Sequence, residues 1–109
     1  MARIEEVCRW ALERGGLAVI LNIHHYEEMA TDPRGHQARF LSLWQQIAAH
    51  FQGAPANLFS ELLNEPNGAC ITLISSEIAA RAIAVIRPAI PAPAHAAPGC
   101  SFDHRVSLL

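Results

Sequence analysis

The stretch NLFSELLNEP, residues 57–66, decides which fold this chain can adopt. Its first seven residues are mainly apolar and too few for most helices, so they predict a buried strand. Asn64-Glu65-Pro66 then follows, and proline cannot continue a ladder of hydrogen bonds. The strand should therefore end there, with an amide and a carboxylate at its end. A surface turn and an active site are both consistent with such an ending.

A second apolar run of the same kind lies earlier in the chain. LAVILNI, residues 17–23, follows two glycines and predicts a strand buried on both faces, as in parallel sheets. His24-His25-Tyr26 comes directly after it. Both predicted strands therefore end in polar side chains.

Apolar side chains recur at helical spacing in three other segments, which predict helices over residues 3–14, 36–51 and 73–87. A loop containing Asp32 and Pro33 should lead into the second helix. The order is helix, strand, helix, strand, helix, with crossover helices of ordinary length. This order is typical of an α/β fold with a parallel sheet or barrel.

The end of the chain has a different composition. RPAIPAPAHAAPGC, residues 87–100, holds four of the seven prolines and is otherwise rich in alanine. A third strand is due here, but proline removes ladder donors and alanine is a weak strand former. We expect loop or poorly ordered chain.

Composition excludes several classes of function. A length of 109 residues allows one domain, and 51% apolar with 17% charged residues suits a globular chain. The net charge is −2 and the eight basic residues are scattered, which argues against nucleic-acid binding. No apolar run has the roughly 18–20 residues of a membrane helix. The N-terminus lacks the apolar core of a signal peptide, and localisation stays open.

The three cysteines, Cys8, Cys70 and Cys100, have no pair at metal-binding or redox spacing. We interpret them as small, partly buried side chains.

In parallel α/β folds, ligands gather at the carboxyl ends of the strands. Here those ends carry His24, His25 and Tyr26 on one strand and Asn64 and Glu65 on the other. Three interpretations are open. The first is a catalytic carboxylate with imidazole and amide support. The second is a metal site of His24, His25 and Glu65, which is disfavoured because adjacent residues of a strand point to opposite faces. The third is structural, with His25 capping a turn and Glu65 in solvent.

The segment VILNIHHYEEMATDPRGHQARFLSLWQQIAAHFQGAPANLFSELLNEPNG, residues 19–68, strongly resembles the cellulase group of glycoside hydrolase family 5. In that family an apolar strand ends in His or His-His-Tyr, a helix with a central Leu-Trp follows, and the next strand ends in Asn-Glu-Pro. The resemblance extends over about residues 4–90. Two such motifs at this separation are far more specific than Asn-Glu-Pro alone.

The resemblance implies a (β/α)₈ TIM barrel that cleaves β-linked glucans and related polysaccharides with retention of configuration. Glu65 is then similar to the family's general acid/base, and Asn64 to the donor that binds the 2-hydroxyl of the sugar at the cleavage point. His24, together with His25 and Tyr26, would line the same subsite. No cofactor and no metal is expected.

A complete barrel takes about 250 residues. We therefore expect a partial barrel of about three βα units, covering strands 3 to 5, with residues 1–90 as partial catalytic domain. Residues 91–109 would be a Pro/Ala-rich tail in the region of the fifth strand.

The family's nucleophilic glutamate has no counterpart here. Glu61 lies four residues before Glu65, about 13 Å away along a strand at roughly 3.3 Å per residue, which is too far for a retaining pair. The alternative function is a truncated, inactive remnant that at most binds glycans weakly or associates with a partner. The unpaired sheet edges also predict self-association.

Overall fold

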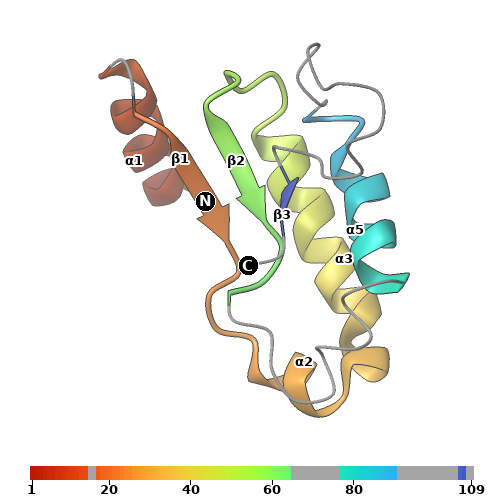
Figure 1. Cartoon of the computed structure of the whole chain (residues 1–109). Coiled ribbons are helices and arrows are strands. Elements are labelled where there is room, and N and C mark those ends of the chain that lie inside the picture. The colour runs from red at the N-terminus through yellow and green to blue at the C-terminus, as the bar shows by residue number, and fades with distance from the viewer. Residues whose placement is uncertain (15–16, 65–76, 91–105, 108–109) are drawn as a thin grey trace.

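The computed structural model describes residues 1–14, 17–64, 77–90 and 106–107. The elements in chain order are α1 (Ala2–Glu13), β1 (Val19–Asn22), α2 (Glu27–Thr31), α3 (Pro33–His50), β2 (Leu58–Glu61), α5 (Ala79–Ile86) and β3 (Val106–Ser107). The strands form one parallel sheet in the order β1-β2-β3. Figure 1 shows α3 and α5 side by side along this sheet, α1 next to β1, and α2 beyond the carboxyl ends of β1 and β2.

The core lies between the sheet and the pair α3 and α5. α3 buries one stripe at helical spacing, with Phe40 and Trp44 fully inaccessible, as the sequence predicted. The helix α5 faces it with Ala82 and Ile86, which are buried together with the N-cap residue Ile78. Each large apolar side chain removed from water contributes roughly 1.5–3 kcal/mol. This layer is therefore what holds the helices on the sheet.

All three predicted helices are present, with different bounds. α3 begins at Pro33, because Asp32 caps it: the Asp32 Oδ1 accepts a hydrogen bond from the Gly35 N–H at 2.9 Å, and proline suits the first helical turn. Residues 27–31, expected to be loop, form the short helix α2. Residues 73–76 of the third predicted helix lie outside the described residues. No helix in the described ranges is long and apolar enough to cross a membrane.

The prediction that the first strand is buried on both faces is wrong. Exposure alternates along β1, and Ile20 is 59% exposed whereas Val19 and Leu21 pack against the core. Ile20 lies on the face opposite the helices, where none of the described elements covers it. A continuous apolar run indicates burial on both faces only when a layer is present on each.

The tail contributes one short strand. Val106–Ser107 forms β3, which pairs in parallel with β2 through Ser60↔Val106 and Glu61↔Ser107. It lies after the segment 87–100 that we expected to be loop, most of which is outside the described residues. The division of the chain at residue 90 stays a prediction, because residues 91–105 lie outside the described residues.

Candidate active site

The structure brings the polar ends of β1 and β2 together. The Asn64 N–H donates a hydrogen bond to the Ile23 carbonyl at 3.2 Å, so that the backbones of His24 and Asn64 are neighbours. This is the arrangement expected for parallel strands that end at one edge. Glu65, the expected acid/base, lies outside the described residues, and its role stays a prediction.

That hydrogen bond reveals a β-bulge in the second strand. The ladder pairs Val19 with Leu58, and the Val19 N–H donates to the Asn57 carbonyl. In a regular parallel ladder of this register, the donor to the Ile23 carbonyl would be the N–H of Leu63. The observed donor is Asn64, one residue later. One extra residue has therefore been inserted after Glu61, where regular pairing stops.

Leu62 and Leu63 are 0% and 4% exposed, so both side chains are buried at the point where the regular pairing stops. Because of the extra residue, each later side chain of the strand emerges on the opposite face of the sheet from the one that regular pairing would give. Without the extra residue Asn64 would emerge on the helix side; with it the alternation along the strand puts Asn64 on the face of Asn22 and Glu61. The bulge therefore determines which way the amide of the Asn-Glu-Pro motif points.

The carbonyl of Leu62 is held by the helix layer. It accepts a buried hydrogen bond from the Trp44 indole Nε1–H at 3.1 Å, and both side chains are fully inaccessible. A bulge leaves backbone groups without ladder partners, and a buried carbonyl without a partner is costly. Trp44 on α3 supplies the missing donor.

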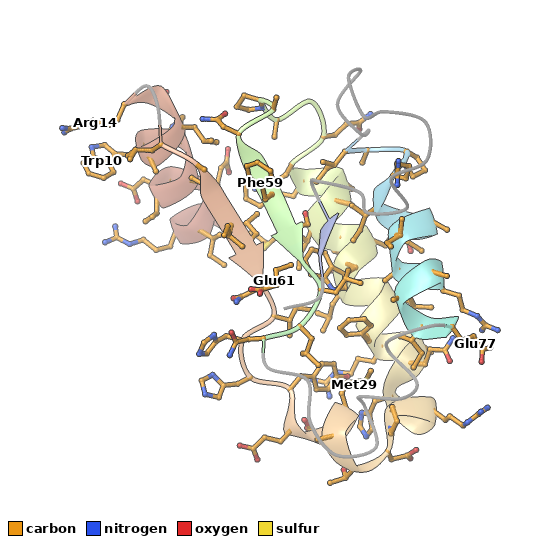
Figure 2. The ribbon with its side chains drawn as sticks, in the orientation of Figure 1. Trp10, Arg14, Met29, Phe59, Glu61 and Glu77 are labelled. Carbon is orange, nitrogen blue, oxygen red and sulfur yellow. The ribbon has the colours of Figure 1, made fainter. Side chains whose placement is uncertain are left out.

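Sequence reasoning missed a pair of polar residues below the site. The Asn22 Nδ2 donates to the Glu61 Oε2 at 2.7 Å, and Glu61 is only 6% exposed. The two residues are register partners at the ends of β1 and β2, and Figure 2 shows Glu61 at the end of β2. Asn22 lies two residues before His24 and Glu61 lies three residues before Asn64, so counting back equally from the two motifs would pair Asn22 with Leu62 instead.

His24 and His25 differ from expectation. Both are exposed, and their rings meet edge to face with centroids 4.7 Å apart. The argument that they point to opposite faces of a strand is wrong, because β1 ends at Asn22 and the histidines follow it. Among the described residues no three His, Cys, Asp or Glu side chains are grouped as metal ligands would be. His25 also lines an open depression of about 540 Å³ above α2.

Tyr26 packs toward α3. Its ring lies edge to face with His36 at 5.9 Å between centroids, and the Arg39 guanidinium stands 5.7 Å from the ring centre. Its hydroxyl is buried, and no described residue gives it a hydrogen-bond partner. Tyr26 thus supports the turn after β1, and its role in lining a subsite stays a prediction.

A second pocket lies away from this site. It measures about 390 Å³ and is bounded by α1 and the segment after α3 that leads to the start of β2. The His50 Nε2 and Glu5 Oε2 lie 3.1 Å apart at its rim, and Cys8 lies in its wall. Burial raises the pKa of the Cys8 thiol, which agrees with a small buried side chain. Cys70 and Cys100 lie outside the described residues.

Comparison with known proteins identifies a family for this chain. The family model described as cellulase (glycosyl hydrolase family 5) matches residues 1–96. Endoglucanase H of Acetivibrio thermocellus is 35% identical over 89 residues, which is 82% of this chain and 10% of that protein. Endoglucanase 1 of Ruminococcus albus is 38% identical over 69 residues, or 61% of this chain and 17% of that protein.

Solved structures agree with this result. The endoglucanase Cel5A of Thermotoga maritima is 48% identical with a TM-score of 0.74, over 81% of this chain and 28% of that one. The cellulose synthase subunit Z of Clostridioides difficile is 38% identical with a TM-score of 0.77, over 83% of this chain and 30% of that one.

The fold is thus part of a TIM barrel, as the sequence predicted, and the sheet with its covering helices is the corresponding part of the barrel wall. The chain spans less than a third of these structures and a tenth to a sixth of the curated relatives. The strand-end motifs and the family match over residues 1–96 lead to one conclusion: the chain belongs to glycosyl hydrolase family 5, the cellulase family.

Proposed function

We propose that this chain forms part of a catalytic domain that hydrolyses O-glycosidic bonds in β-linked polysaccharides with retention of configuration. The observation that carries the proposal is the meeting of the two motifs at one edge of the sheet, through the hydrogen bond from Asn64 to Ile23. The relative Cel5A of Thermotoga maritima has been crystallised with cellobiose and with mannotriose. Those ligands favour a β-glucan or a related polysaccharide as the substrate.

In this proposal Glu65 is the general acid/base. A retaining glycosidase needs one carboxyl group that protonates the leaving oxygen and then, as a carboxylate, takes a proton from water. Asn64 donates to the 2-hydroxyl of the sugar at the cleavage point, a contact that strengthens in the transition state. His24 lines the same subsite, with His25 and Tyr26 near it.

The nucleophile comes from another part of the domain. A retaining pair requires a second carboxylate about 5–5.5 Å from the acid/base. Glu61 is the buried carboxylate among the described residues. It accepts a hydrogen bond from Asn22, and it lies earlier on β2, three residues before Asn64. We therefore assign Glu61 a structural role, in which its hydrogen bond with Asn22 links the ends of β1 and β2.

The proposal is tested by placing this chain, in full, into the matching segment of the Thermotoga maritima Cel5A endoglucanase. Release of reducing sugar from a soluble β-glucan is measured with the unchanged segment, with Glu65→Gln and with Glu77→Gln. We expect Glu65→Gln to lower kcat by a factor of about 10² or more, because general acid–base catalysis typically supplies about 10²–10⁴. Glu77→Gln, an exposed carboxylate on the helix side, is the matched control. Full activity of Glu65→Gln would refute the acid/base role.

A second candidate function is a non-catalytic one, in which the chain by itself binds glycans weakly or associates with a partner. The position of Glu61 favours it, since no described carboxylate is free to act as nucleophile on the face of Asn64. Titration of the isolated chain with cellotetraose separates the two. Saturable binding without turnover supports the non-catalytic function, and turnover excludes it.

A further inference from the structure

We propose that Trp44 is a positioning residue for Asn64, acting through the β-bulge after β2. In this inference Trp44 contacts no substrate but helps to orient a residue that does. The part of the test that measures enzyme activity rests on the proposed function. It is carried by three observations: the register shift after Glu61, the hydrogen bond from Trp44 to Leu62, and the hydrogen bond from Asn64 to Ile23.

The two hydrogen bonds hold the bulge from opposite sides. The Leu62 carbonyl is fixed by the indole of α3 at 3.1 Å, and the Asn64 N–H is fixed by β1 at 3.2 Å. Only Leu63 lies between these two anchored residues, and its side chain is buried. With both ends held, the backbone has little freedom to return to regular pairing. Regular pairing would put Asn64 on the face of the helices.

The indole N–H is the essential part of Trp44 in this proposal. A buried indole needs a hydrogen-bond acceptor, and a buried carbonyl needs a donor, so each satisfies the other. Without the N–H, the Leu62 carbonyl loses its partner in the layer where Trp44 and Leu62 are both fully inaccessible. A buried carbonyl without a donor is costly, so the backbone around Leu62 should rearrange and the bulge should lose its anchor. Trp44 would still fill the core but would no longer select the register.

Packing and positioning can be separated with analogues of tryptophan. The experiment uses the full chain carrying Trp10→Phe, so that Trp44 is the one remaining tryptophan. Trp10 is exposed and far from β2 in the structure. Biosynthetic incorporation of 5-fluorotryptophan keeps the N–H, whereas benzothienylalanine keeps the ring shape and replaces the N–H by sulfur.

The readout is hydrogen exchange of single backbone amides by NMR. We expect the Asn64 amide to exchange faster in the benzothienylalanine chain by about fivefold or more, the factor that one hydrogen bond of ordinary strength supplies. The Ile47 amide of α3 should exchange equally in both chains. Equal protection of Asn64 with the two analogues would overturn the proposal, and so would loss of protection that is the same at Asn64 and Ile47.

The activity arm covers the case in which the isolated chain shows no protected amides. In the Cel5A hybrid containing this segment, Trp44→Phe removes the donor, and Phe51→Leu removes core volume from the same helix stripe. We expect Trp44→Phe to lower kcat about tenfold or more with KM little changed, because a misdirected Asn64 loses a contact that strengthens in the transition state. An equal effect of Phe51→Leu would overturn the proposal. If the hybrid with the unchanged segment hydrolyses no glucan, the proposed function is refuted. The role of Trp44 is then decided by the amide-exchange experiment alone.

Discussion

Ser60 is the least expected side chain of the core. It is 1% exposed, emerges on the helix face of β2, and its hydroxyl has no hydrogen-bond partner among the described residues. Its neighbours on that face are apolar: Leu58 on the same strand and Leu21 as its register partner. The hydroxyl therefore carries a desolvation cost that no contact in the described chain offsets.

Replacing Ser60 should stabilise the chain. We expect Ser60→Ala to raise the free energy of unfolding by about 1 kcal/mol, because it removes an unsatisfied buried hydroxyl and leaves almost the same volume. Urea denaturation followed by circular dichroism measures the change. Ser42→Ala, at an exposed position of α3, is the control and should have little effect. A loss of stability in Ser60→Ala would show that the hydroxyl has a partner.

The helix α3 connects the two ends of the candidate site. Its first turn is fixed by Asp32, its middle carries Trp44 against the bulge, and its end leads through Gly53 into β2. Gly53, three residues after the last residue of α3, has φ +77°, a left-handed conformation that suits glycine. The length of α3 thus sets where its indole meets the strand.

The cap of α3 can be tested directly. We expect Asp32→Ala to lower the free energy of unfolding by about 1 kcal/mol, because the N–H of Gly35 loses its acceptor. Asp32→Asn keeps an acceptor oxygen and should retain most of the stability. Thermal unfolding of the three chains, measured side by side, is sufficient. Equal stability of the alanine and asparagine variants would contradict the capping role.

Across the molecule, much apolar surface stays open on the side of α1 and β1. Ile4, Val7 and Trp10 along α1 are each about half exposed, and Leu17 and Ile20 are exposed at the edge strand. A free parallel edge with apolar side chains is a template for pairing with another chain. In a complete barrel, further strands would cover this side.

The isolated chain should therefore associate with itself. We expect its apparent molecular mass in analytical ultracentrifugation to rise with concentration, and its melting temperature to change with it. Ile20→Lys introduces a charge at the edge strand and should weaken the association. Ala80→Lys, at an exposed position of α5 away from that edge, is the control. A monomer with a sharp melting transition at all concentrations would exclude this prediction.

The sequence by itself determined the alternation of three helices with two strands, the buried stripe of α3, the family and the two polar strand ends, but neither α2 nor β3. Each of these features depends on the spacing of apolar and polar residues along the chain, which can be read from the sequence alone. Only the tertiary structure decided the direction of Asn64, the exposure of Ile20 and the pairing of Asn22 with Glu61. Each of these depends on which residue of another strand lies opposite, or on whether a layer covers a face. The extra residue after Glu61 leaves no mark in the pattern of NLFSELLNEP, because a bulge is a relation between two strands, and here an indole from a third element holds it in place.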